Sequence, residues 1–190
     1  MNTSLIIVSG LPRSGTSMLM KMLEAGGMEI VTDNLRQPDS DNPNGYFEYE
    51  PVKQLARNAA WVRTMRGKAL KVISFLLYYL PASVSYQILF MQRDLQEILA
   101  SQQKMLDRLG QDSKTVSDDV LAQKFATHLQ KVTGWIATQK NMTCLYVDYR
   151  AVLHDPKSKA SEIQQFLQQP LHLENMASAV DYALYRNRLD

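Results

Sequence analysis

A glycine-bounded loop near the N-terminus, Gly10 to Leu19 (GLPRSGTSML), limits the folds open to this 190-residue chain. An apolar run, Leu5 to Val8, precedes the loop, and a helix-like stretch, Met18 to Glu24, follows it. A strand, a loop and a helix in this order direct the N–H groups of a helix N-terminus towards an anion. The sequence therefore predicts a phosphate-binding loop.

The loop approaches the Walker A pattern GxxxxGK[ST] but lacks its lysine. Gly10 to Ser17 supplies both glycines, and Thr16 stands where the lysine would contact the β- and γ-phosphates of a nucleoside triphosphate. Arg13 places a cation inside the loop instead, and Ser14 to Ser17 offers backbone and hydroxyl donors. These residues indicate a phosphate cradle without the standard ATP or GTP apparatus. The plainer alternative is a turn that joins a strand to a helix.

Strand-like and helix-like patterns alternate along the whole chain. This alternation is typical of βαβ crossovers, so we expect one domain, residues 1–190, with a mostly parallel five-stranded sheet covered by helices on both faces. The expected strands are Leu5–Ser9, Glu29–Thr32, Ala69–Ile73, Gln87–Met91 and Cys144–Asp148. Further helices are expected from Leu95 to Leu109, from about Asp118 to Gln139, and from about Ser158 to Gln168.

Composition narrows the partners and the compartment. A net charge of +2 with 21% charged residues gives no reason to expect a nucleic acid partner. Cys144 is the single cysteine, which fits a reducing compartment. The sequence shows no signal peptide and no apolar run near the roughly 20 residues that span a membrane. We therefore expect a cytoplasmic protein without a membrane partner; the sequence does not indicate its oligomeric state.

One segment, Asp33 to Tyr49, breaks the alternation. It combines prolines, a glycine and several Asn and Asp residues without helical or strand periodicity, and a loop of this length in a compact domain is usually functional or disordered. The aromatic residues Tyr46, Phe47 and Tyr49 argue against disorder. The segment follows the second strand, so it should reach the carboxyl edge of the sheet, where open α/β folds bind ligands.

A second motif follows the fourth strand. Arg93 leaves that strand at the same carboxyl edge as the first loop, and Ser101 lies eight positions further on the next helix. The arrangement suits a second anion site. Taken alone, however, an Arg-Asp pair that opens a helix is more often a surface ion pair or a helix start.

Together the two motifs resemble those of sulfotransferases that use 3′-phosphoadenosine 5′-phosphosulfate (PAPS). In that family the first loop binds the 5′-phosphosulfate and carries Lys or Arg at the position of Arg13, followed by SGT. In the same family an Arg at a strand end and a Ser on the next helix bind the 3′-phosphate. The spacing of Arg93 and Ser101 matches that motif. The run from Leu145 to Leu167 is similar to the family's closing strand and helix. The resemblance extends from Ile6 to about Pro170.

The resemblance implies a P-loop-type fold and in-line transfer of a sulfuryl group from PAPS to a hydroxyl or amine acceptor, with no required metal. It implies that Arg13 stabilises charge on the leaving group. The implied nucleotide-binding residues are Pro12, Arg13, Ser14, Gly15, Thr16, Ser17, Arg93, Ser101 and Arg186. Arg188 is the alternative to Arg186 for a second basic contact to the 3′-phosphate, and a solvated C-terminal tail is the plainer interpretation of both.

The resemblance also bears on the general base. Cytosolic members that sulfate small molecules use a histidine before the 3′-phosphate motif, whereas all three histidines here follow Ser101. Members that act on polysaccharide or protein tyrosine place a glutamate near the end of strand two, which matches Asp33. A carboxylate base is therefore implied, with Asp33 ahead of Glu48 and Glu50 a later rival. The alternative interpretation is structural: Asp33 would be an ordinary turn residue, and Glu48 a carboxylate at the start of a helix.

Two other functions remain open at this point. A small P-loop kinase acting on a metabolite or nucleotide is disfavoured by Thr16 in place of lysine and by the lack of an obvious Mg²⁺ carboxylate at a strand end. A non-catalytic nucleotide-binding module would keep the fold and lack the base. The acceptor is not identified by the sequence, because specificity depends on loop shape.

Overall fold

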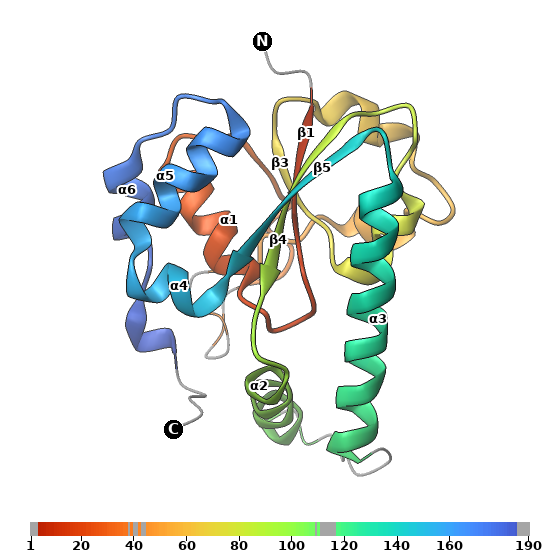
Figure 1. Ribbon diagram of the computed structural model, residues 1–190, viewed down its shortest axis with the longest axis vertical. Coiled ribbons are helices and arrows are strands. Elements are labelled where there is room, and N and C mark those ends of the chain that lie inside the picture. The colour runs from red at the N-terminus through yellow and green to blue at the C-terminus, as the bar shows by residue number, and fades with distance from the viewer. Residues whose placement is uncertain are drawn as a thin grey trace.

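The computed structural model describes residues 4–37, 39, 42, 45–108, 110 and 117–185. Its centre is a five-stranded sheet with the order β2-β3-β1-β4-β5, in which every pair of neighbouring strands is parallel (Figure 1). The strands are β1 Leu5–Ser9, β2 Ile30–Val31, β3 Ala69–Lys71, β4 Tyr86–Gln92 and β5 Met142–Asp148. All five expected strands are confirmed.

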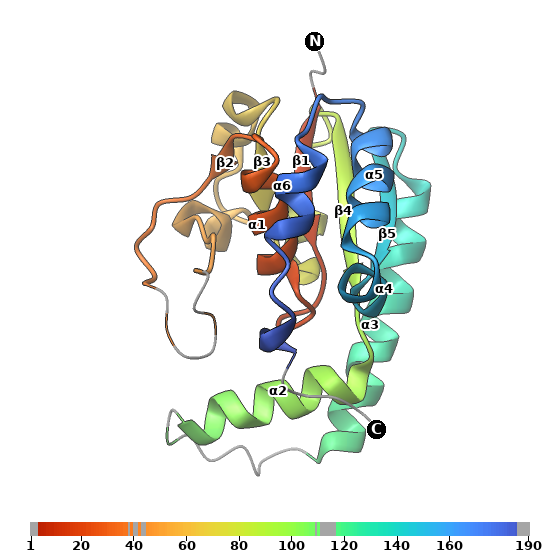
Figure 2. The same cartoon turned by 90° about the vertical axis from the view of Figure 1, so that its left-hand side faces the viewer.

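Helices cover both faces of the sheet. One face carries α1 (Thr16–Ala25), α4 (Tyr149–His154), α5 (Pro156–Leu167) and α6 (Leu173–Ser178). The other carries α3 (Asp118–Thr138) and three 3₁₀ helices, η1 (Glu50–Gln54), η2 (Ala60–Met65) and η3 (Ser74–Tyr79), as Figures 1 and 2 show. Alternate residues of β1 enter the two cores, Leu5 and Ile7 on one side and Ile6 and Val8 on the other. The expected three-layer α/β/α architecture is confirmed.

Helix α2 (Leu95–Arg108) belongs to neither face. It begins directly after β4 and runs across the carboxyl edge of the sheet towards the loop that follows β2 (Figure 2). Asp94 caps its N-terminus, because Oδ1 accepts the N–H groups of Gln96 at 2.8 Å and Glu97 at 3.3 Å. Asp94 thus has the helix-start role that the plainer interpretation gave to this Arg-Asp pair. Arg93 does not share that role and lines a cavity at the sheet edge.

Two short helices and a terminal 3₁₀ helix were not expected from the sequence. Helix α4 forms immediately after β5, where the carboxylate of Asp148 accepts the N–H of Ala151 at 2.7 Å. Helix α6 and the 3₁₀ helix η4 (Tyr182–Leu184) follow α5. Among the described residues of the Asp33–Tyr49 segment there is only an isolated bridge, between Asp39 and Asn42, as the lack of periodicity predicts.

None of the helices in the described part of the chain is both long enough and apolar enough to cross a membrane.

Candidate functional site

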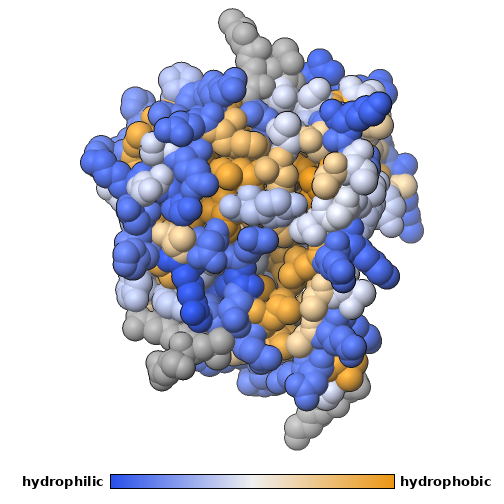
Figure 3. All heavy atoms as spheres, in the orientation of Figure 1, coloured by the Kyte–Doolittle hydropathy of each residue, from blue (hydrophilic) through white to orange (hydrophobic). Residues whose placement is uncertain are grey.

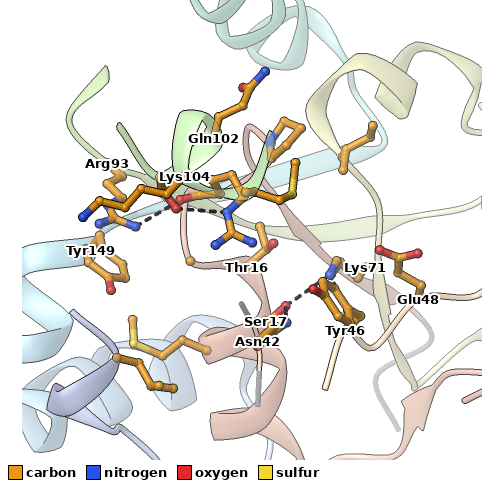
Figure 4. Close-up of a pocket in the computed structure, with 18 of the residues that line it drawn as sticks. Thr16, Ser17, Asn42, Tyr46, Glu48, Lys71, Arg93, Gln102, Lys104 and Tyr149 are labelled. Atoms are coloured by element: carbon orange, nitrogen blue, oxygen red, sulfur yellow. Dashed lines mark hydrogen bonds between the residues drawn. The ribbon is translucent and has the colours of Figure 1, made fainter. Parts of the chain in front are cut away.

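A cavity of about 490 Å³ lies at the carboxyl edge of the sheet, where the loop after β1, the helix α2 and the loop after β2 meet (Figure 4). It falls within the usual size of small-molecule sites, about 300–1,000 Å³. Among the described residues, basic side chains outnumber carboxylates around it. They are Arg13, Arg36, Lys71, Arg93, Lys104 and Arg108, against Glu48 and Asp181. This excess of positive charge suits a ligand with several negative charges.

The loop between β1 and α1 presents a helix N-terminus to this cavity. Gly15 caps α1 in a left-handed conformation, with φ 104°, and a Cβ atom there would lie 2.5 Å from the Tyr149 ring. Thr16 and Ser17 form the first turn of α1, whose N–H groups have no partner within a helix. Both residues line the cavity, together with Pro12, Arg13 and Gly15. The predicted strand–loop–helix arrangement is present.

Ser14 takes a different place from the one expected for its hydroxyl. Its side chain is buried, and Oγ donates a hydrogen bond to the carbonyl oxygen of Leu11 at 2.7 Å. The backbone N–H of Ser14 donates to the same oxygen at 3.2 Å. The side chain of Ser14 therefore braces the loop from within and is not directed at a ligand.

The two motifs predicted from the sequence meet at the cavity wall. Arg13 Nε donates a hydrogen bond to Ser101 Oγ at 3.0 Å, although the residues are 88 positions apart. Arg93 donates from one of its terminal nitrogens to the carbonyl oxygen of Arg13 at 3.1 Å. The guanidinium of Arg93 also lies over the Tyr149 ring, 4.2 Å from its centroid. Arg13, Ser101 and Arg93 thus form one continuous surface.

Lys71, at the end of β3, is a site residue that the sequence reasoning missed. Its ammonium group donates to Ser17 Oγ at 3.2 Å and to the carbonyl oxygen of Tyr46. Burial first, then the nearby cations Arg36 and Arg13, lower the pKa of Lys71 to about 8, against the opposite effect of Glu48. A lysine from the neighbouring strand β3 thus lies beside the first turn of α1, although the loop itself contains no lysine.

The loop after β2 returns to the end of that strand and places Glu48 beside it. Thr32 Oγ1 and the N–H of Asp33 both donate to the carbonyl oxygen of Glu48, at 3.0 and 3.2 Å. The Glu48 carboxylate lines the cavity and accepts a hydrogen bond from Arg36 at 2.8 Å. Its side chain is 27% exposed. Glu48 therefore lies beside the end of β2 in space, although it is 16 positions from Thr32, the residue after β2, in the sequence.

Asp33 itself has another task. Its carboxylate accepts the N–H of Glu50 at 2.6 Å and the N–H of Leu35 at 3.0 Å, and it is not among the residues that line the cavity. These two backbone hydrogen bonds, that of Glu50 first, lower the pKa of Asp33 below its usual value. Asp33 thus closes the loop, and of these two carboxylates it is Glu48 that lines the cavity. Glu50 is exposed and paired with Lys53 at 2.7 Å.

Arg36 and Tyr46 form the other part of this loop's contact with the cavity. The Arg36 guanidinium lies 3.4 Å from the centroid of the Tyr46 ring, and the Tyr46 hydroxyl donates to the Asp39 carboxylate at 2.7 Å. Asn42 donates from its amide to Ser17 Oγ at 2.9 Å and so connects this loop to the first. Figure 4 shows Tyr46, Lys71 and Glu48 on the same side of Thr16 and Ser17, with Asn42 next to Ser17.

His128 is not among the residues that line the cavity. Arg186 and Arg188 are outside the described residues. His128 Nε2 lies 2.9 Å from Ser74 Oγ, and its ring stacks on Phe75 at 3.8 Å, so it is a packed structural residue. In the part of the chain that the structure describes, no group of three or more His, Cys, Asp and Glu residues is placed to hold a metal ion.

The residues missed by sequence reasoning share a signal. Lys71 and Tyr149 each stand at the carboxyl end of a parallel strand, which is the rule that located Arg93. A lysine that ends an apolar strand such as Ala69–Lys71 could have been singled out on this ground. Lys104 and Arg108 follow Ser101 on α2 at helical spacing, so the face they share with it could also have been found.

The all-parallel sheet with the loop between β1 and α1 at its carboxyl edge defines an α/β protein of the P-loop type. The sequence matches the sulfotransferase domain family over residues 3–188, and the chain therefore belongs to that family. No match is found among curated proteins.

Two solved structures share the fold. The sulfotransferase domain from the curacin biosynthetic pathway is 14% identical, with a TM-score of 0.56, over 98% of this chain and 92% of that domain's chain. The sulfotransferase domain from the Synechococcus PCC 7002 olefin synthase is 13% identical, with a TM-score of 0.53, over 98% of this chain and 80% of that one.

Proposed function

We propose that this protein is a PAPS-dependent sulfotransferase that transfers the sulfuryl group to a hydroxyl or amine acceptor, with no metal required. The observation that carries the proposal is the direct contact between the two phosphate motifs, Arg13 Nε to Ser101 Oγ at 3.0 Å and Arg93 to the Arg13 carbonyl at 3.1 Å. One nucleotide with phosphates at both its 5′ and 3′ positions would engage both motifs. A nucleoside triphosphate has no 3′-phosphate, so it would not account for the motif of Arg93 and Ser101.

The charges fit such a donor. Its 5′-phosphosulfate would lie at the N-terminus of α1 with Thr16, Ser17 and Arg13, and its 3′-phosphate at Arg93 and Ser101. The side chain of Lys71 approaches the same first turn of α1 from the opposite side to Arg93 (Figure 4). The donor half of the cavity thus faces β1 and β4, which leaves the side of β2 and β3, with Glu48, for the acceptor.

These positions suggest how the reaction proceeds. Glu48 takes the proton of the acceptor as the acceptor's oxygen or nitrogen attacks the sulfur. The bond between the sulfur and the bridging oxygen of the donor breaks, and negative charge grows on that oxygen. Arg13 and Lys71 stabilise this charge, together with the N–H groups at the start of α1. Sulfated acceptor and 3′-phosphoadenosine 5′-phosphate (PAP) are released.

The test is a comparison of PAP with AMP, which lacks only the 3′-phosphate, in buffer containing EDTA. We expect PAP to bind about 10- to 100-fold more tightly by calorimetry, because charge-assisted hydrogen bonds to the 3′-phosphate contribute roughly 1.5–3 kcal/mol. Incubation with PAPS and a panel of alcohols, phenols and amines should release PAP without added metal. Equal affinity for PAP and AMP, or phosphate transfer from Mg²⁺–ATP to the same panel, would overturn the proposal.

Lys71 leads to a prediction on pH. In the free protein it is protonated below its pKa of about 8 and neutral above it, whereas a bound anion favours the protonated form. PAP affinity should therefore fall as the pH rises through 8, and binding at pH 8 should take up about half a proton. Calorimetry in two buffers that differ in ionisation enthalpy measures this uptake.

The matched control is Lys71→Arg, which stays charged throughout this range. It should bind PAP with no proton uptake near pH 8. Uptake of the same size in Lys71→Arg would assign the titration to another group, and no uptake in the unmodified protein would contradict the prediction.

A further inference from the structure

A buried carboxylate lies behind the 3′-phosphate motif and has no part in the reaction described above. Glu97 is in the first turn of α2, and its side chain is 0% exposed. One carboxylate oxygen accepts a hydrogen bond from Arg93 Nε at 2.9 Å. The other accepts from two nitrogens of Arg150, at 2.9 and 2.5 Å, and from the Tyr185 hydroxyl at 2.6 Å.

These partners come from three separate parts of the chain. Arg93 ends β4, Arg150 is in α4 and Tyr185 follows η4 near the C-terminus. The Tyr185 ring also packs edge-on against Tyr149, with 5.7 Å between centroids. Glu97 is therefore the point at which the C-terminal segment, α4 and the carboxyl end of β4 are joined.

The bond from Arg93 Nε to Glu97 determines how the guanidinium of Arg93 is oriented. The Arg93 side chain is only 7% exposed, and the Tyr149 ring lies against one face of its guanidinium. Glu97 engages Nε, the inner end of a group that has five N–H donors in a rigid plane. At its outer end one terminal nitrogen donates to the loop carbonyl of Arg13, and Arg93 lines the cavity.

The charge of Glu97 is maintained by the same contacts. Burial alone would raise the pKa of its carboxyl, but hydrogen bonds from Tyr185, Arg150 and Arg93 outweigh burial, and the pKa lies below its usual value. Glu97 is therefore ionised across the physiological range of pH. A neutral side chain of the same shape would not serve both arginines equally well.

We propose that Glu97 is a positioning residue for the 3′-phosphate site: it orients Arg93 for the phosphate and, through Tyr185, couples that site to the C-terminal segment. The proposal rests on the proposed function, because it assigns Arg93 to the 3′-phosphate. Glu97 itself does not line the cavity and acts through Arg93.

Glu97→Gln tests this role. An amide has one acceptor and one donor end, so whichever way it turns, an N–H group faces a donor of Arg93 or Arg150. We expect the ratio of AMP to PAP dissociation constants to fall about tenfold, by analogy with the loss of a charge-assisted hydrogen bond, while AMP affinity is kept. A purely structural role would weaken both ligands alike.

A double-mutant cycle tests whether the effect passes through Arg93. Arg93→Ala should lower the ratio strongly, and adding Glu97→Gln to it should lower the ratio no further. Tyr185→Phe removes one donor to Glu97 by deleting a hydroxyl, and should lower the ratio about threefold. Tyr79→Phe, at an exposed tyrosine of η3 on the other face of the sheet, is the matched control and should leave it unchanged.

The outcomes separate this inference from the proposed function. An unmodified protein that binds PAP and AMP equally would overturn the proposed function and this role with it. A normal preference for PAP that persists unchanged in Glu97→Gln would overturn the role of Glu97 alone, as would an equal effect of Glu97→Gln in the Arg93→Ala background. Should Glu97→Gln lose its circular dichroism signature of folding, Tyr185→Phe decides: a lowered ratio supports the role and an unchanged ratio refutes it.

Discussion

Arg13→Ala is expected to lower kcat by about 10²–10³-fold, with a much smaller loss of PAP affinity. The reason is that negative charge on the bridging oxygen is largest in the transition state, so a cation placed beside it contributes more to the rate than to binding. The measurement is steady-state release of PAP from PAPS, with the panel acceptor that gives the highest rate for the unmodified protein. PAP affinity is measured by calorimetry.

Two controls make this result specific. Arg13→Lys keeps the charge but cannot reproduce the bond from Nε to Ser101, so it should retain more activity than the alanine variant. Arg57→Ala removes an exposed arginine that does not line the cavity and should leave kcat unchanged. Equal losses of kcat and PAP affinity in Arg13→Ala would reduce Arg13 to a binding residue.

Glu48→Gln is expected to reduce turnover by roughly 10²-fold or more, while PAP binding is kept. Glutamine can still accept the hydrogen bond from Arg36, but it cannot take a proton from the acceptor. Lost turnover with unchanged PAP affinity would separate loss of the base from loss of the ion pair.

Asp33→Asn is the matched control for Glu48→Gln. An asparagine has one acceptor oxygen where Asp33 uses two, so one backbone hydrogen bond of the loop is lost. Its effect should show mainly in the melting temperature and only weakly in kcat. A loss of turnover in Asp33→Asn without one in Glu48→Gln would return the role of base to Asp33.

The sheet could be predicted from local sequence patterns, because each expected strand forms in the structure. The strands of a parallel sheet are apolar on both faces, so Leu5–Ser9 and Gln87–Met91 stand out from the amphipathic helices around them. The position of Arg93 followed from the same reasoning, since the carboxyl ends of parallel strands share one edge. The short helix α4 was missed because its six residues carry too little periodicity.

The choice between Asp33 and Glu48 depended on tertiary contacts that no local pattern contains. The path of the loop back to β2 is set by Lys71 bonding the Tyr46 carbonyl and by Asn42 bonding Ser17, across 25 residues in each case. These contacts bring Glu48 to the cavity and leave Asp33 to bind backbone N–H groups. Glu97 was equally hidden, because Arg150 and Tyr185 lie 53 and 88 positions away from it.

The strand order has an evolutionary consequence. Because β1 lies between β3 and β4, the motif that follows β4 lies on one side of the first loop and the loop after β2 lies on the other. That loop is anchored at Asn42 and Tyr46, and surface loops in general tolerate changes of length and sequence. On the proposed function, a change of acceptor would then require remodelling of this one surface segment, while the residues assigned to the donor stay as they are.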